Sequence, residues 1–322
     1  MTNTDMIREL RSLTQAGMKD CKEALEETGW DIQKAVDVIK TKGLNIADGR
    51  SGRAASEGIV TVVHNTQVAA VMLEINCQTD FVANSSDFKS FARHAVGILC
   101  NKWNHNQVFQ ASDVEDTRKA LVAITKENIV VRRWWAEEAV APHARVFSYV
   151  HSNNKIGVLV TLLAPSQEAA SNQQFIELGE NLAMQAAAMN PIAVDVERLS
   201  ADEVARQKAI FEQQLTDLNK PQAAWPKILE GKFRKWYTEV CLMEQESVWI
   251  PKTSVKQVVA NTGDAVGGEI KIITLLRCQV GEGIEVKKDN LAEEVAKLTD
   301  QENGKIDTHY HVDGLFYDRD YK

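Results

Sequence analysis

The chain lacks any long apolar run and any concentration of basic residues. No stretch of the 322 residues approaches 18 consecutive apolar positions, so no transmembrane helix is expected. The formal net charge is −8 without a basic block, which makes the chain a poor candidate for neutralising nucleic-acid phosphates. The N-terminus has neither the basic-then-apolar order of a signal peptide nor an Arg-rich transit composition. Its partner is therefore expected to be another protein, with no direct nucleic-acid or membrane binding.

Cysteine is scarce and shows no pairing pattern. The five cysteines are widely spaced, odd in number and free of any C-x-x-C pair: Cys21, Cys77, Cys100, Cys241 and Cys278. This spacing indicates reduced thiols rather than a disulfide framework or a zinc site. We therefore expect a cytoplasmic protein.

The recognised active-site motifs are also missing. The sequence contains no G-x-x-x-x-G-K-[ST], no G-x-G-x-x-G, no H-E-x-x-H and no G-x-S-x-G. His309 and His311 stand one residue apart, so on a strand they would point to opposite faces, which disfavours a metal site. We predict no catalytic residue, metal or cofactor. The absence of these motifs does not exclude an enzyme. Such an enzyme would need a deep polar pocket in which catalytic side chains from distant positions converge.

The length and the apolar patterns predict an α+β protein of several domains. Residues 5–42 read as three short helices, the third capped by Asp31 and carrying Ile32, Ala35, Val36 and Ile39 on one face. We predict that this bundle spans residues 1–42 and that a flexible linker follows over 43–57. Two related halves then span 58–144 and 145–286, and the second half contains an insertion at about 199–243. A C-terminal helical module at 287–299 and a tail of unknown role at 300–322 complete the predicted division.

Each half is predicted to be a β-hairpin followed by a helix. In the first half the strands are Gly58–His64 and Val68–Ile75, and in the second half they are Arg145–His151 and Lys155–Leu163. The helix of the first half carries Phe88, Phe91, Ala92, Ala95 and Leu99 on its inner face, and the helix from about Ser166 carries Phe175, Leu178, Leu182 and Met189. Because Val63-His64-Asn65 aligns with Val150-His151-Ser152, we expect the two halves to be a repeat, each with a helix packed on an antiparallel sheet.

The insertion reads as an antiparallel helical hairpin, and a last strand follows it. Its apolar stripes are Val204, Phe211, Leu215 and Leu218, then Trp225, Leu229, Phe233, Trp236 and Val240. A protruding arm of this kind is typical of a structural element or of a contact between two copies. The strand Glu269–Val280 completes the second half, and Asp289–Leu298 predicts a short helix.

The segment from Cys77 to Val82 places an acid beside a large aromatic ring. It follows an apolar run and precedes a helix start at Ser85-Ser86-Asp87, so it is expected to form a strand-to-helix corner. Asp80 favours water or a cation, whereas Phe81 favours burial. The residues alone leave two arrangements open: Phe81 tucked under its own helix, or Phe81 exposed for a partner.

Three ordered segments resemble the elongation factor Ts family. They are Glu74–Ala83, Leu10–Leu25 and the Gly-Glu-Gly-Ile turn within Val280–Glu285. The resemblance implies a guanine-nucleotide exchange factor for the GTPase elongation factor Tu, with a ubiquitin-associated type of N-terminal bundle, a core of two related halves and a C-terminal helix that docks on the partner's nucleotide-binding domain. An adaptor that uses the bundle alone and has no exchange activity is the alternative.

The resemblance also implies roles for single residues. Phe81 would be the wedge that enters the partner, Asp80 would compete for the groups around Mg²⁺, and Thr79 and Val82 would fix the corner. Met18, in the loop after Gly17, and His151, in the second hairpin, would contact the partner; for Met18 a role as core filler stays open, and for His151 a role at its own turn. Lys19 stands where the family commonly has a second Met, so that part of the contact departs from the pattern.

Overall fold

A computed structural model describes residues 2–14, 16–39, 41 and 53–284. Its first part is a bundle of three helices, as predicted: α1 (Asn3–Thr14), α2 (Met18–Glu27) and a third helix over residues 32–39. The Asp31 carboxylate accepts the backbone N–H of Lys34 at 3.1 Å, which confirms the expected cap. The small core of the bundle consists of Leu10, Ala16, Cys21, Ala24, Leu25, Ala35 and Ile39.

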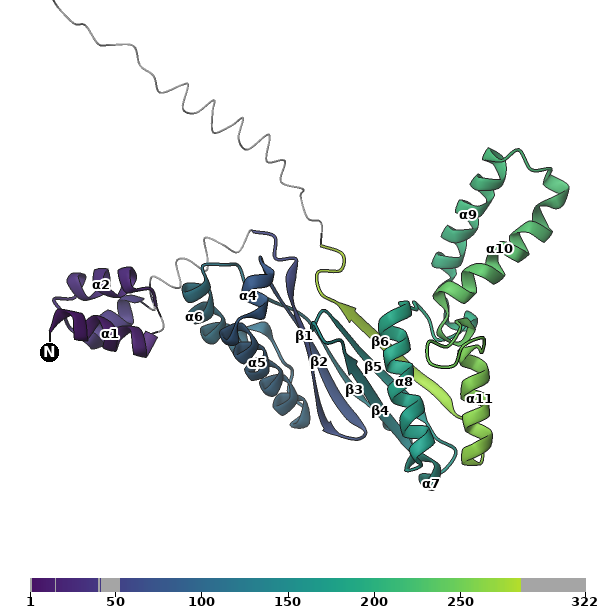
Figure 1. The fold of residues 1–322 in the computed structure, drawn as a ribbon, viewed down its shortest axis with the longest axis horizontal. Coiled ribbons are helices and arrows are strands. Elements are labelled where there is room, and N and C mark those ends of the chain that lie inside the picture. Colours follow the sequence, from purple (N-terminus) through teal and green to yellow (C-terminus); the bar gives the residue numbers. More distant parts are fainter. Residues whose placement is uncertain (1, 15, 40, 42–52, 285–322) are drawn as a thin grey trace, which may run out of the picture. The chain divides into compact units, whose positions relative to one another are not determined.

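The first half of the core is built on a three-stranded antiparallel sheet in the order β1-β2-β3 (Figure 1). The strands are β1 (Glu57–Thr66), β2 (Ala69–Cys77) and β3 (Val130–Glu138). The hairpin β1–β2 confirms the prediction, whereas β3 was not foreseen. All nine residues of β2 are buried, because a neighbouring strand lies on each side of it and packed layers cover both of its faces.

Helices cover one face of this sheet. They are α4 (Asp80–Asn84), α5 (Ser86–Asn104) and α6 (Glu115–Thr125), with the 3₁₀ turn η1 (Ala111–Val114) before α6. Ser85 begins α5 as predicted, since its hydroxyl accepts the backbone N–H of Phe88 at 3.2 Å. The predicted inner face of α5 is buried against Val71, Leu73 and Ile75 of β2.

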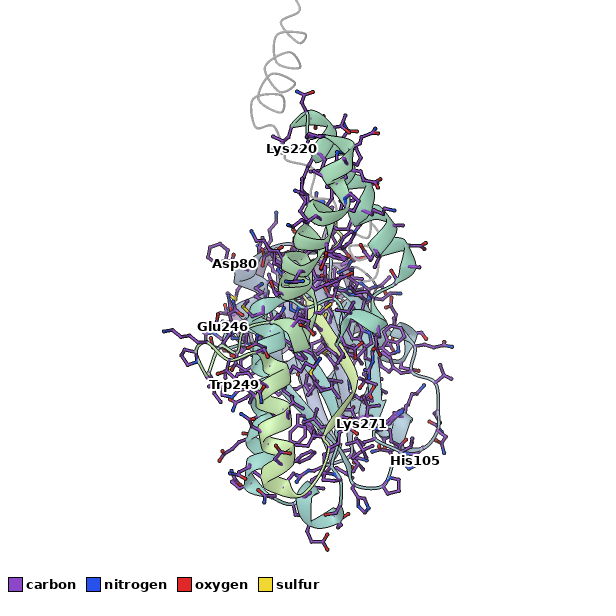
Figure 2. The ribbon with its side chains drawn as sticks, turned by 90° about the vertical axis from the view of Figure 1, so that its right-hand side faces the viewer. Asp80, His105, Lys220, Glu246, Trp249 and Lys271 are labelled. Carbon is purple, nitrogen blue, oxygen red and sulfur yellow. The ribbon has the colours of Figure 1, made fainter. Side chains whose placement is uncertain are left out.

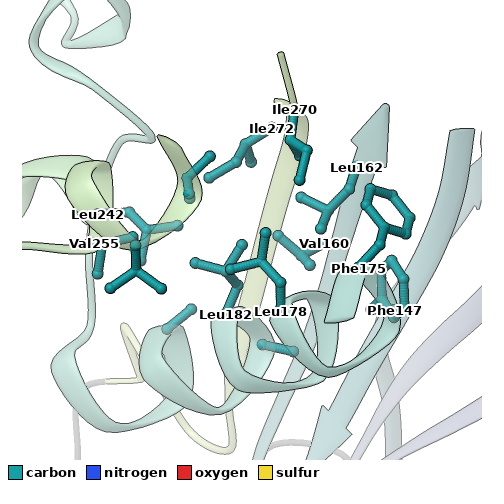
Figure 3. Close-up of a cluster of buried hydrophobic side chains, with 14 of the residues drawn as sticks. Phe147, Val160, Leu162, Phe175, Leu178, Leu182, Leu242, Val255, Ile270 and Ile272 are labelled. Atoms are coloured by element: carbon teal, nitrogen blue, oxygen red, sulfur yellow. The ribbon is translucent and has the colours of Figure 1, made fainter. Parts of the chain in front are cut away.

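The second half repeats this plan with the sheet order β4-β5-β6. Its strands are β4 (Ala144–Val150), β5 (Ile156–Leu163) and β6 (Lys271–Gln279), and its helices are α7 (Gln167–Ala170), α8 (Gln173–Met189) and α11 (Val255–Val266). Figure 3 shows Leu178 and Leu182 of α8 packed in the cluster that includes Val160 and Leu162 of β5. The three predicted strands are confirmed, and α11 was missed.

Two details of the predicted helix in this half are wrong. The helix begins after Ser166 but is interrupted, because the Asn172 side chain starts a new cap by accepting the N–H of Gln174. Met189 was expected to point inward, yet it is 42% exposed. It is the last residue of α8, and the left-handed Asn190 ends the helix there, so the chain turns away before Met189 can reach the core.

The two sheets pack face to face across a shared apolar layer. Val60, Ala70 and Met72 of the first sheet meet Val146, Leu159 and Cys278 of the second. The sheets approach closely at Gly157, where an added Cβ would lie 2.4 Å from Cγ1 of Val60. The two halves of the core therefore form one packed unit.

The insertion is the predicted helical hairpin, made of α9 (Ala201–Asp217), the 3₁₀ turn η3 (Gln222–Ala224) and α10 (Trp225–Val240), with Lys220 at its tip (Figure 2). We call this hairpin the arm. The rings of Phe211 and Phe233 meet edge to face with centroids 5.3 Å apart. Leu218 was expected in the seam but is 62% exposed, because it lies past the last turn of α9.

Some predicted features lie outside the described residues. They include most of the linker 43–57, the helical module 287–299 with Asp289–Leu298, the tail 300–322, and the pair His309 and His311. The domain boundaries stay a prediction. Within the described parts of the chain, no helix is both long and apolar enough to cross a membrane.

Candidate functional site

The acid–aromatic segment forms a separate short helix. Thr79 leaves β2 in an extended conformation, and its hydroxyl accepts the backbone N–H of Val82 at 3.4 Å to begin α4. Ser85 ends this helix, since its N–H and its hydroxyl both donate to the carbonyl oxygen of Val82. The expected corner is thus one helical turn, capped at both ends and followed at once by α5.

This turn presents Phe81 to solvent. Phe81 is 84% exposed, and Asp80 beside it is also exposed at the periphery of the molecule (Figure 2). The opposite side of α4 is anchored, because Ala83 is buried and Val82 packs against the first core cluster. The arrangement in which Phe81 is tucked inward is therefore wrong.

The carboxylate of Glu127 holds the start of the turn. Its Oε2 accepts the backbone N–H groups of Gln78 and Thr79, both at 3.0 Å, and its Oε1 accepts the Thr79 hydroxyl at 2.5 Å. Glu127 follows the end of α6, at the left-handed Lys126. Glu127 was not foreseen from the sequence, because it lies 48 positions after Thr79 and no local pattern links the two.

A second contact joins the same two segments. The backbone N–H of Asn128 donates to the Gln78 side-chain oxygen at 3.1 Å, and the Asn128 side chain donates to the carbonyl oxygen of Arg53 at 2.7 Å. Asn128 is 3% exposed, so these bonds are shielded from water. Residues 127 and 128 thus fix residues 78 and 79 from one side.

The other two predicted contact residues lie on separate elements. Met18 is the first residue of α2 rather than a loop residue, and it is 49% exposed, so it is not core filler. Lys19 is exposed beside it and lies 3.9 Å from Glu23. His151 follows β4 and is exposed, with its Nδ1 3.1 Å from the Tyr149 hydroxyl. Its backbone N–H closes the second hairpin by donating to Ile156.

Two of the three segments that carry the family resemblance, Glu74–Ala83 and Val280–Glu285, meet at the buried Glu74. This carboxylate accepts Nη1 of Arg132 at 3.0 Å, Nε of Arg133 at 2.5 Å and the backbone N–H of Gly281 at 2.9 Å. Burial alone would raise the pKa of the Glu74 carboxyl, but these donors together outweigh burial and hold its pKa below the usual value. Gly281 adopts φ 75°, and a Cβ there would lie 2.3 Å from the Ser56 carbonyl oxygen, so the turn requires glycine.

The titratable groups near this site do not resemble a catalytic centre. Burial raises the pKa of the Cys77 and Cys278 thiols to about 12, so both are protonated and weak nucleophiles. Within residues that the structure places, no group of three or more His, Cys, Asp or Glu side chains is arranged to hold a metal ion. What the arrangement offers is an exposed ring and a carboxylate on a rigid support.

Comparison with known proteins gives one consistent family. A family model described as Elongation factor TS matches residues 78–282, and one described as UBA-like domain matches residues 1–41. The elongation factor Ts of Clostridioides difficile (strain 630) is 37% identical over 303 residues, covering 91% of this chain and 97% of that protein. The elongation factor Ts of Mesorhizobium japonicum is 37% identical over 301 residues, covering 90% and 96%.

Proposed function

This chain belongs to the elongation factor Ts family, and from that premise we propose that it promotes GDP release from elongation factor Tu. It acts in the cytoplasm as a binding protein and not as an enzyme. The observation that carries the mechanism is the exposure of Phe81, which is 84% exposed on a turn that is held at both ends.

The target of this turn is the metal site of the partner. A GTPase holds GDP through backbone N–H groups of its phosphate loop and through a Mg²⁺ ion. Mg²⁺ demands a nearly ideal octahedron of oxygens, so a small displacement of that shell costs much nucleotide affinity. In this proposal Phe81 enters an apolar cleft of the partner beside the metal.

Asp80 and Phe81 have different roles on the same turn. The ring supplies apolar burial and bulk, whereas the Asp80 carboxylate competes for the hydrogen bonds and charge that organise the Mg²⁺ shell. Thr79 caps the turn and Val82 anchors it to the core, so that both side chains are offered in one fixed pose.

Magnitudes show that Phe81 does not act alone. An acceleration of GDP release by about 10⁴ requires about 5.5 kcal/mol, whereas burial of one Phe side chain contributes about 1.5–3 kcal/mol. The remainder must come from a wider interface, to which we assign the exposed Met18 and His151. By linkage, this factor weakens GDP binding as much as GDP weakens the binding of this factor.

The experiment is the release of labelled GDP from a bacterial elongation factor Tu, with and without the chain. Phe81→Ala is expected to lower the accelerated rate by about ten- to a hundredfold, the value of the lost ring burial. The double variant Asp80→Ala, Phe81→Ala is expected to lose most of the acceleration.

Val140→Ala is the matched control, because Val140 is an equally exposed apolar residue, at 86%, in the connection between β3 and β4. It is expected to leave the rate unchanged. Full acceleration by the double variant would refute the wedge, while no acceleration by the wild-type chain would refute the exchange function itself. If residues 1–42 alone bound the partner as tightly as the whole chain does, and the whole chain left GDP release unchanged, the adaptor alternative would replace the exchange function.

A further inference from the structure

The turn that carries Phe81 is too short to be stable by itself. The helix α4 has five residues, and a helix of that length does not form in water without tertiary support. Its Val82 and Ala83 pack inward and hold its C-terminal part, whereas Asp80 and Phe81 stand at its N-terminal end. The groups that hold the N-terminal end of α4 therefore decide the pose of the wedge.

That end is held through the Thr79 hydroxyl. A hydroxyl has one proton to donate and two lone pairs to accept. The Thr79 proton goes to Oε1 of Glu127, which leaves a lone pair directed at the backbone N–H of Val82. Glu127 thereby sets the orientation of the cap, and the cap sets the first turn of α4.

Glu127 is itself well placed to be a rigid support. Its Oε2 accepts two consecutive backbone N–H groups, from Gln78 and Thr79, and hydrogen bonds to a carboxylate are stronger than those between neutral groups. Its neighbour Ile129 is fully buried, and Asn128 is tied to Gln78 and Arg53. The support is thus continuous with the first core cluster, to which Ile129 belongs.

We propose that Glu127 is a positioning residue for nucleotide exchange. It holds Thr79 so that Asp80 and Phe81 are in their working pose before the partner arrives, and the ordering of α4 does not have to accompany docking. The inference rests on the proposed exchange function. It assigns to Glu127 an effect on the exchange step, separate from its effect on folding.

The two effects are distinguished by measuring GDP release at increasing concentrations of the full-length chain. Glu127→Ala is expected to lower the saturating release rate about tenfold, while the half-saturating concentration stays within about twofold, because the rest of the interface still docks. Glu127→Gln keeps one carbonyl oxygen as an acceptor, so it is expected to recover the rate to within about threefold of wild type.

The matched control is Asp113→Ala. The Asp113 carboxylate accepts the backbone N–H of Gln110 at 2.8 Å and the Lys102 ammonium at 2.6 Å, so it holds a comparable turn away from α4. Both variants are expected to lower the melting temperature, but Asp113→Ala is expected to leave the saturating rate unchanged. A higher half-saturating concentration for Glu127→Ala, with an unchanged saturating rate, would overturn the proposal in favour of a purely structural role.

A combined variant completes the test. Adding Glu127→Ala to the double variant Asp80→Ala, Phe81→Ala is expected to slow release no further, because Glu127 acts only through these two side chains. If Phe81→Ala slows release and Glu127→Ala does not, the positioning role fails and the exchange function stands. If neither slows release, the wedge mechanism fails and this inference fails with it.

Thr79→Val is the substitute test variant if Glu127→Ala does not fold. This change removes only the hydroxyl between Glu127 and Val82, and the two backbone hydrogen bonds to Oε2 remain. The saturating rate is expected to fall several-fold, since the cap of α4 is lost. An unchanged rate in a folded Thr79→Val chain would overturn the proposal.

Discussion

The carboxylate of Glu74 accepts the backbone N–H of Gly281 at 2.9 Å, although 207 residues separate the two. Glu74 opens the segment that leads to Phe81, and Gly281 opens the Gly-Glu-Gly turn. Arg132 and Arg133 of β3 bind the same carboxylate, so one buried anion joins the first sheet to the end of β6. The two sequence segments therefore meet in one buried cluster of ion pairs and hydrogen bonds around Glu74.

Glu74→Gln is expected to lower the free energy of unfolding by about 3 kcal/mol, because it removes the buried negative charge that balances the guanidinium groups of Arg132 and Arg133. Urea unfolding at pH 7 measures this loss. Glu282→Gln is the control: this side chain is 48% exposed and 3.6 Å from Arg133, so less than about 1 kcal/mol is expected. Equal losses of unfolding free energy in the two variants would contradict the assigned importance of the buried Glu74 carboxylate.

The same carboxylate predicts a pH dependence. Its pKa in the folded chain lies below the ordinary value, so its contribution to stability is present above the unfolded pKa, about 4.3, and is lost as pH falls through the folded pKa. The stability difference between wild type and Glu74→Gln should shrink below about pH 4. Urea unfolding at pH 7, 5 and 3.5 tests this, and a difference that grows on acidification would refute the assigned direction.

Gly157→Ala is expected to lower the free energy of unfolding by about 1–3 kcal/mol through overpacking between the sheets. An added Cβ would lie 2.4 Å from Cγ1 of Val60 and 2.9 Å from the Met72 sulfur. Gly231→Ala on α10 is the matched control, since nothing lies within 4 Å of its added Cβ, and it should stabilise by about 0.5–1 kcal/mol. Thermal denaturation of both variants distinguishes packing from backbone propensity.

Three thiols are expected to resist alkylation in the folded chain at pH 8. Burial raises the pKa of Cys77 and Cys278 to about 12 and that of Cys241 to about 11, so almost none of each is thiolate. Peptide mass mapping after iodoacetamide treatment measures the extent of labelling. The urea-denatured chain should label at all five cysteines, and rapid native labelling of Cys77 or Cys278 would show that the sheets open.

The exposed apolar residues of the arm predict pairing of two copies. Ile210 and Leu218 are 44% and 62% exposed on α9 and at its end. Sedimentation velocity should show a dimer at micromolar concentration, and the double variant Ile210→Glu, Leu218→Glu should sediment as a monomer because charge opposes burial. A wild-type chain that remains monomeric over the same range would assign the arm another role.

Local pattern predicted the elements whose apolar residues repeat regularly. The β1–β2 and β4–β5 hairpins and the inner face of α5 follow directly from alternation and from the cap at Ser85. The strand β3 was missed because four of its nine residues are charged, and two of these, Arg132 and Arg133, have their partner in Glu74. Their role is visible only once β2 lies beside them.

The helix α11 was missed for a different reason. Its Val, Asn, Thr and Gly residues are weak helix formers, so packing of Val255, Val258 and Val259 against the second core decides its conformation. At the site, the role of Phe81 was inferred from the family resemblance, but the residue that holds its turn, Glu127, was not foreseen. Glu127 reaches Thr79 only through the fold, and no spacing rule connects positions 48 residues apart.

The apolar layer that the two sheets share limits how this molecule can be divided. A fragment that stopped before β4 would turn Val60, Ala70 and Met72 toward water, with the helices covering only its other face. Such a fragment should associate with itself or with the complementary fragment rather than remain single. Each half therefore needs the other half, or a second copy of itself, to cover the free face of its sheet.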